Sequence, residues 1–157
     1  IGAIDLLWQQ AEHKRRNRMS HKELKDEAKE SEGDPQMKMT RRRRAQEIAM
    51  NSMLADIAKS SVVVVNPAHY AVALQWDASF EGPPICVAKG VDEVAARIRE
   101  KANEAGVPIH RDPPTARAIH ATTDIGQEIH PDQYGAVAAA IRFAEKMRDL
   151  ARQKILE

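Results

Sequence analysis

The stretch SVVVVNPAHYAVAL, residues 61–74, decides the fold of this chain. Two apolar runs rich in β-branched residues, 61–65 and 70–74, flank the tetrapeptide Asn-Pro-Ala-His at 66–69. Runs of this length and composition predict strands, and an Asn-Pro dipeptide between them predicts a tight turn. The sequence therefore predicts a β-hairpin with its turn at 66–69.

The bond between Asn66 and Pro67 has a chemical weakness of its own. The Pro67 nitrogen carries no hydrogen, so it cannot attack the Asn66 side chain in the usual deamidation reaction. The remaining route is attack by the Asn66 side-chain nitrogen on its own main-chain carbonyl, which closes a succinimide and breaks the bond to Pro67. A strained turn that aligns the two groups would accelerate this slow reaction by proximity. Asn-Pro is also a common turn dipeptide, so the motif alone leaves both interpretations open.

Outward from the hairpin, strand and helix patterns alternate. On the amino-terminal side a helix is expected over about 37–58, and only its second half carries an apolar face that can dock on a core. On the other side we expect a strand, an amphipathic helix, a short strand and two further helices, at about 85–88, 91–102, 107–110, 113–119 and from 131 onward. Strand, helix, strand in this order implies a right-handed crossover and a parallel strand pair.

Three details of these elements can be compared with the structure. Lys89-Gly90 is expected to close the third strand, and Asp92 lies in the first turn of the helix that follows, where a carboxylate suits the helix dipole. The inward face of the last helix is expected to consist of Tyr134, Val137, Ala138 and Ile141.

The predicted fold class is α/β, with a small mixed four-stranded sheet flanked by about four helices and preceded by a long charged helical arm. Residues 1–47 form this arm, residues 48–148 form the α/β domain, and residues 149–157 form a polar tail. The arm has few apolar residues and no broad face to bury, so it is expected to be solvated.

Composition limits the classes of function. The 157 residues include 24 Lys and Arg against 23 Asp and Glu. Residues 1–59 hold 13 basic and 10 acidic residues, a net of +3, and this spread-out surplus does not by itself make a nucleic-acid-binding domain. Cys86 is the only cysteine, so no internal disulfide forms. No stretch approaches the ~20 apolar residues of a membrane span.

The chain does not begin with Met and shows no signal-peptide pattern, so we expect it to be a piece of a longer protein. Residues 14–18 form a basic cluster, KRRNR, near its start. If a membrane segment precedes it, the positive-inside rule places this cluster on the cytoplasmic side, where it would contribute to binding anionic lipids.

A search for other chemistry yields little. His110, His120 and His130 are spaced ten residues apart, which fits no common metal-ligand pattern. Cys86 has no CxxC partner, and Lys89-Gly90 alone is not a phosphate-binding loop. We therefore expect no metal and no cofactor, and a Cys86–His nucleophile pair stays open as a minor alternative.

Several ordered motifs now carry a resemblance. The chain resembles the cytoplasmic domain of the FlhB/YscU/SpaS family, the export-switch proteins of flagellar and virulence type III secretion. The match covers almost the whole chain. The sequence from Trp8 through the basic arm is more similar to the flagellar branch of the family. The motifs that carry it are SEGDP at 31–35, VVNP at 64–67, HYAVAL at 69–74, VAKG at 87–90, GVPI at 106–109, PP at 113–114, ARA at 116–118 and IGQEI at 125–129.

The resemblance implies a function for the turn. It implies a parent protein embedded in the bacterial inner membrane, with this domain on the cytoplasmic face. It also implies that the Asn-Pro bond is cut autocatalytically, which lets the export gate change from early to later substrates. Asn66 would cyclise, Pro67 would supply the leaving nitrogen, and His69 would assist by polarisation or proton transfer. The chain is thus at most a single-turnover, self-cleaving protein and not an enzyme.

Position 68 departs from the family, which usually has Thr where this chain has Ala68. Thr is not among the reacting atoms, so the chemistry remains available. A Thr hydroxyl can hydrogen-bond within the turn and Ala cannot, so we expect impaired cleavage and a largely continuous 66–67 bond.

The implied partners are other export-gate components, export substrates with their chaperones, and a substrate-length-control protein, with no nucleic acid. The fragment itself is expected to be a monomer. Three alternatives stay open: a virulence (injectisome) homologue with the same switch role, a hydrolase that uses His69 or Cys86, and a nucleic-acid or membrane-surface adaptor built on the basic arm.

Overall fold

A computed structural model describes residues 2–156, so Ile1 and Glu157, the ends of the predicted arm and tail, lie outside the described residues. The elements, with 3-10 turns marked η, are α1 (Gly2–Glu32), α2 (Pro35–Asp56), η1 (Ile57–Lys59), β1 (Val62–Asn66), β2 (Tyr70–Gln75), β3 (Ile85–Val91), α3 (Asp92–Glu104), β4 (Ile109–Arg111), α4 (Pro113–Thr122), η2 (Pro131–Gln133) and α5 (Tyr134–Ile155). The chain divides into two compact units between Ile48 and Ala49. Within residues 2–156, no helix has both the length and the apolar character that crossing a membrane requires.

The charged arm is helical, as predicted, and is interrupted once. Every side chain of α1 whose surroundings are described is exposed, because the sequence provides no broad apolar face. Gly33 has a φ of +72°, which ends α1. The Asp34 carboxylate then accepts a hydrogen bond of 3.0 Å from the Gln36 N–H, and Pro35 opens α2 two residues before the predicted start.

The second unit contains the predicted mixed sheet, with strand order β3-β2-β1-β4. β1 pairs antiparallel with β2, and β2 pairs antiparallel with β3. β4 returns through α3 to lie parallel to β1, as the strand-helix-strand order predicts. The hairpin quoted first therefore forms the centre of the sheet.

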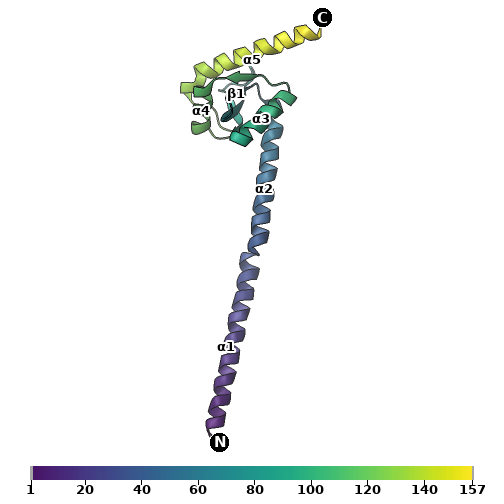
Figure 1. Ribbon diagram of the computed structural model, residues 1–157. Coiled ribbons are helices and arrows are strands. Elements are labelled where there is room, and N and C mark those ends of the chain that lie inside the picture. Colours follow the sequence, from purple (N-terminus) through teal and green to yellow (C-terminus); the bar gives the residue numbers. More distant parts are fainter. Residues whose placement is uncertain (1, 157) are drawn as a thin grey trace. The chain divides into compact units, whose positions relative to one another are not determined.

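Helices cover both faces of this sheet (Figure 1). Val62 and Val64 pack with residues of α4 and α5 on one face. Val63 and Val65 pack with η1 and α3 on the other face, where the end of α2 also contributes. A strand buried on both faces needs apolar side chains at every position, which explains the unbroken valine run.

Two expectations about element ends are wrong. β3 does not close at Lys89-Gly90 but continues to Val91, because Lys89 and Gly90 pair with Val72 and Ala71 of β2. The short strand begins at Ile109 and not at residue 107; Pro108 has no N–H to donate, although its carbonyl accepts from Val63 at 3.0 Å.

The predicted inward face of the last helix is half right. Val137 and Ile141 are buried in the core as expected. Tyr134 is 42% exposed and Ala138 is also exposed, so the prediction is wrong for these two. Both instead line a surface groove beside the loop that precedes β3.

Candidate functional site

The predicted turn joins the two central strands. Asn66 and Tyr70 are the last paired residues of the hairpin, so Pro67, Ala68 and His69 form the connection. The backbone N–H of His69 donates a hydrogen bond of 3.0 Å to the carbonyl oxygen of Asn66. Proline at the second position and a positive φ at the third are the features of a type II turn.

Ala68 carries the strain in this turn. Its φ of +71° lies in the left-handed region, which residues with a Cβ atom adopt at a cost of roughly 1–2 kcal/mol. Glycine fits this region freely, whereas a β-branched residue is disfavoured more strongly than alanine. The strain stored beside the Asn66-Pro67 bond therefore depends on the side chain at position 68.

The turn is accessible, and the Asn66 side-chain amide, the predicted nucleophile, is not hydrogen-bonded within the described residues. Asn66 is half-buried at the end of β1, and the next three residues are exposed. In the part of the chain that the structure describes, the Asn66 side-chain amide makes no hydrogen bond. Its nitrogen is thus not held away from the main chain.

This arrangement suits cleavage between Asn66 and Pro67. The oxygen that would gain negative charge when the Asn66 carbonyl is attacked already accepts a hydrogen bond from the His69 N–H. A fixed donor aimed at developing charge is the oxyanion-hole arrangement. The attacking amide belongs to the same residue, so proximity is supplied by the covalent structure.

The His69 side chain has a neighbour that sequence reasoning missed. Its Nδ1 lies 3.6 Å from Oδ1 of Asp92, and these side chains are 67% and 77% exposed. The backbone N–H of Asp92 also donates to the His69 carbonyl at 2.9 Å. The sequence indicates Asp92 only as a first-turn residue of a helix, and the contact depends on the pairing of Tyr70 with Val91, which no local pattern reveals.

Asp92 lies at the junction of β3 and α3, which we call the corner and which includes Lys89, Gly90 and Val94. The Lys89 side chain, 20% exposed, donates from Nζ to the carbonyls of His120 (3.1 Å) and Thr123 (2.8 Å) at the end of α4. A Cβ atom added to Gly90 would lie 2.3 Å from Cγ1 of Val94, so β3 and α3 meet too closely there for any side chain. The VAKG motif thus builds the corner beside the turn.

Cys86 and His69 are not brought together. Cys86 is fully buried, and burial raises the pKa of its thiol to about 11. Cys86 pairs with Leu74, whereas Tyr70, the neighbour of His69, pairs with Val91. Leu74 and Tyr70 are four residues apart along β2, which corresponds to about 13 Å. A buried, protonated thiol at this distance does not act as a nucleophile with His69.

The three evenly spaced histidines also have separate surroundings. The His110 ring lies 4.9 Å from that of Phe143, and the His120 ring lies 5.1 Å from that of Tyr70. The His130 Nε2 is 3.2 Å from the Thr122 carbonyl oxygen. Across residues 2–156, no group of three or more His, Cys, Asp or Glu side chains is arranged to hold a metal ion.

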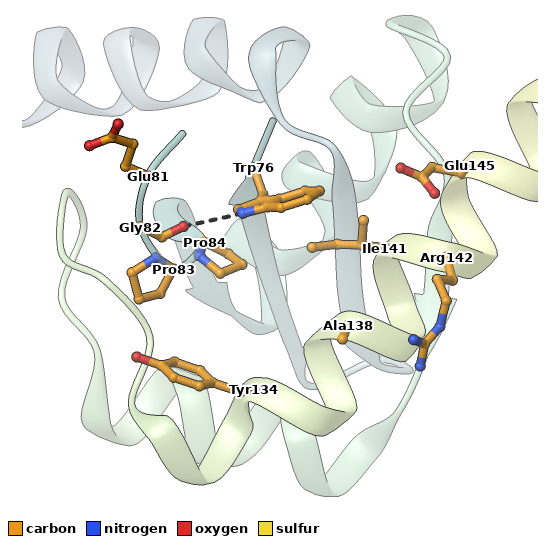
Figure 2. Close-up of a pocket in the computed structure, with 10 residues that line it drawn as sticks. All are labelled: Trp76, Glu81, Gly82, Pro83, Pro84, Tyr134, Ala138, Ile141, Arg142 and Glu145. Atoms are coloured by element: carbon orange, nitrogen blue, oxygen red, sulfur yellow. Dashed lines mark hydrogen bonds between the residues drawn. The ribbon is translucent and has the colours of Figure 1, made fainter. Parts of the chain in front are cut away.

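A second surface feature is an apolar groove of about 570 Å³ on the α5 side of the sheet. Figure 2 shows the Trp76 ring between Pro84 and Ile141, with Tyr134 beside the prolines. The Trp76 Nε1–H donates to the Gly82 carbonyl at 3.2 Å, which fixes the ring against the loop. The groove can receive one or two apolar side chains of a partner.

Comparison with known proteins places the chain in one family. Residues 1–144 match the model of the FlhB HrpN YscU SpaS family. The flagellar biosynthetic protein FlhB of Escherichia coli K12 is 41% identical over 145 residues, which are 92% of this chain and 38% of that protein. FlhB of Bacillus subtilis 168 is 38% identical over 148 residues, which are 94% of this chain and 41% of that protein. The chain spans about two fifths of the length of these relatives.

Solved structures agree with this assignment. The crystal structure of the cytoplasmic domain of FlhB from Shewanella putrefaciens matches with a TM-score of 0.62 and 38% identity, covering 66% of this chain and 80% of that one. An EscU C-terminal domain with an asparagine replaced by alanine matches at 0.57 and 32%, covering 59% and 93%. The same domain with the following proline replaced by alanine matches at 0.56 and 32%, covering 59% and 91%. This chain therefore belongs to the FlhB, HrpN, YscU and SpaS family, and its sheet corresponds to the part of FlhB solved as a cytoplasmic domain.

Proposed function

We propose that this chain is the cytoplasmic part of a type III protein-export component, and that it controls substrate switching through autocatalytic cleavage between Asn66 and Pro67. The observation that carries the proposal is the hydrogen bond from the His69 N–H to the Asn66 carbonyl, inside a turn strained at Ala68. The relatives named flagellar are 38% and 41% identical over most of the chain, which favours the flagellar branch.

The step that breaks the bond uses only atoms of the turn. The Asn66 side-chain nitrogen bonds to the Asn66 main-chain carbonyl carbon and loses a proton. The bond from this carbon to the Pro67 nitrogen breaks, and that nitrogen takes up a proton as it leaves. Water later opens the succinimide at the end of the first fragment. His69 supplies its backbone N–H to the oxyanion, and its imidazole transfers the proton.

The structure gives a second reason why Ala68 would slow this reaction. A Thr at this position would be β-branched in the left-handed region, so the uncleaved turn would carry more strain than it does with Ala. Cleavage relieves this strain, so a less strained turn gains less free energy from cleavage and is expected to react more slowly. We infer slow cleavage of this chain on both this ground and the missing hydroxyl.

The EscU relatives support a functional role for the Asn-Pro pair. Domains in which an asparagine, or the proline that follows it, is replaced by alanine have been crystallised with the same fold. Because that fold tolerates each single replacement, a chemical role for the two residues fits better than a packing role.

The setting of the domain follows from the family and remains part of the proposal. We place residues 1–47 as a membrane-proximal linker, 48–148 as the switch domain and 149–157 as a tail, within a parent protein of the inner membrane. Its partners would be other export-gate components, export substrates with chaperones, and a length-control protein. The groove between Trp76 and Ile141 suits an apolar segment of an export substrate.

Cleavage is tested by intact mass spectrometry on the Ala68→Thr chain and on the same chain with Asn66→Ala. We expect fragments 1–66 and 67–157 from the first and only the intact mass from the second. Fragments in the presence of Asn66→Ala, or a fully intact Ala68→Thr chain, would overturn the proposal.

Switching is tested in cells that carry the parent protein. With Asn66→Ala, export of early substrates should continue and export of later ones should fall. Ala68→Thr serves as the matched control, and it should export both. Normal export of later substrates with Asn66→Ala would separate switching from cleavage and refute this half of the proposal.

A further inference from the structure

We propose that Asp92 is a positioning residue for His69, and that the corner between β3 and α3 orients the imidazole for its proposed part in cleavage. The inference rests on the proposed self-cleavage. It adds a residue that lies outside the Asn-Pro-Ala-His motif and more than twenty positions along the chain.

Asp92 contacts His69 in two ways. Its carboxylate Oδ1 lies 3.6 Å from the imidazole Nδ1, and its backbone N–H donates to the His69 carbonyl at 2.9 Å. At 3.6 Å the carboxylate is at ion-pair distance, slightly beyond a hydrogen bond. Its charge favours the imidazole form with the proton on Nδ1, which leaves Nε2 free to exchange a proton with the reacting groups.

Burial of its side chain does not explain why Asp92 adopts this conformation. Its φ of +47° is unfavourable for a residue with a Cβ atom, and its side chain is 77% exposed. Ala68 is the other non-glycine residue with positive φ in the described part of the chain, and it lies next to His69. Strained residues persist where the surroundings fix them and gather at functional sites. Here one strained residue precedes His69 in the turn, and the other contacts its ring from the end of β3.

The surroundings that fix Asp92 belong to the rigid corner. The backbone of Gly90 packs directly under Val94, with no room for a Cβ atom. One residue earlier, Lys89 ties β3 to the end of α4. The Asp92 backbone thus lies between fixed elements, and Asp92 contacts His69 at its carbonyl and at its ring.

The first test uses two substitutions that the backbone tolerates. Glycine and asparagine both adopt positive φ readily, so Asp92→Gly and Asp92→Asn should fold. In the Ala68→Thr chain, we expect Asp92→Gly to lower the cleavage rate about tenfold, which corresponds to about 1.4 kcal/mol of lost transition-state stabilisation. Asp92→Asn should fall between, because its amide keeps the size and polarity of the carboxylate but loses the charge.

A double-mutant comparison separates positioning from a structural role. If Asp92 acts through His69, Asp92→Gly should have no further effect once His69→Ala is present. Equal slowing with and without the imidazole, or cleavage of Asp92→Gly at the parent rate, would overturn the inference. If Asn66→Ala still permits cleavage, the proposed function fails instead, so the two failures are distinguishable.

A spectroscopic test does not depend on cleavage. In the non-cleaving Asn66→Ala chain, ¹⁵N NMR of the His69 ring reports which nitrogen carries the proton. We expect a predominance of the Nδ1–H form, reduced by Asp92→Gly. An unchanged ring spectrum after Asp92→Gly would contradict the contact on which the inference rests.

Discussion

The carbonyl oxygen of Asn66 accepts a 3.0 Å hydrogen bond from the backbone N–H of His69, and the turn closed by this bond holds Ala68 at a φ of +71°. One bond of the chain thus has a hydrogen-bonded carbonyl, an adjacent side-chain amide and local strain.

The first prediction concerns the side chain at position 68. Thr and Val have nearly the same shape, and both are β-branched, but only Thr has a hydroxyl. If strain drives cleavage, Ala68→Val and Ala68→Thr should both accelerate it, by up to about tenfold for each 1.4 kcal/mol of added strain. Ala68→Gly should slow it. Intact-mass time courses give the rates, and acceleration by Thr alone would assign the effect to the hydroxyl.

The second prediction concerns the close approach of the Gly90 backbone to Val94. Gly90→Ala places a Cβ atom 2.3 Å from Val94 Cγ1, so α3 must shift. We expect a loss of about 1–3 kcal/mol in the free energy of unfolding, measured by urea denaturation. Gly135→Ala is the matched control, because Gly135 has open space around it within α5. That substitution should stabilise the domain by about 0.5–1 kcal/mol, and an equal loss at both positions would contradict the packing argument.

The third prediction concerns Lys89, whose ammonium group binds two carbonyls at the end of α4. Lys89→Met keeps the apolar stem and removes the charged donor. Hydrogen bonds to a charged group contribute about 1.5–3 kcal/mol, so the melting temperature should fall clearly. Lys101→Met removes an exposed pair with Glu104 and should change little. Comparable melting of the two variants would show that Lys89 does not anchor the corner.

The fourth prediction concerns pH. Burial raises the pKa of the Cys86 thiol to about 11, above its value of 9.0 when exposed. The folded state therefore keeps the thiol protonated while the unfolded state loses the proton, so stability falls as pH rises from about 9 toward about 11. In Cys86→Ala this part of the alkaline loss should be absent. A thiol reagent should react only after denaturation, and rapid labelling of the folded chain would contradict the burial.

The family and the sheet were accessible from sequence because their signals are local. The valine run before Asn66 indicates a strand buried on both faces, and the order of strand and helix patterns predicts the parallel pair of β1 and β4. The motif around Asn66 carries its chemistry in adjacent residues, so the candidate bond could be named without a structure. The roles of Asn66, Pro67 and His69 in cleavage remain predictions.

The second half of the site was not accessible in this way. Asp92 contacts His69 only because β2 and β3 pair in one particular register. The sequence of neither strand alone predicts that register. Gly90 looks like a strand terminator in sequence, but it lies inside β3, where its missing side chain admits Val94. Tyr134 fits an inward helical face by periodicity, yet it lines a groove at the start of α5, and the core begins at Val137.

The central claim, slow self-cleavage at one bond, is tested most directly by the intact mass of the freshly purified, unaltered chain followed over days. We predict that nearly all molecules are continuous at first, and that two fragments, 1–66 and 67–157, then accumulate slowly and together. Prompt and complete splitting between Asn66 and Pro67, or fragments produced at any other bond, would contradict it.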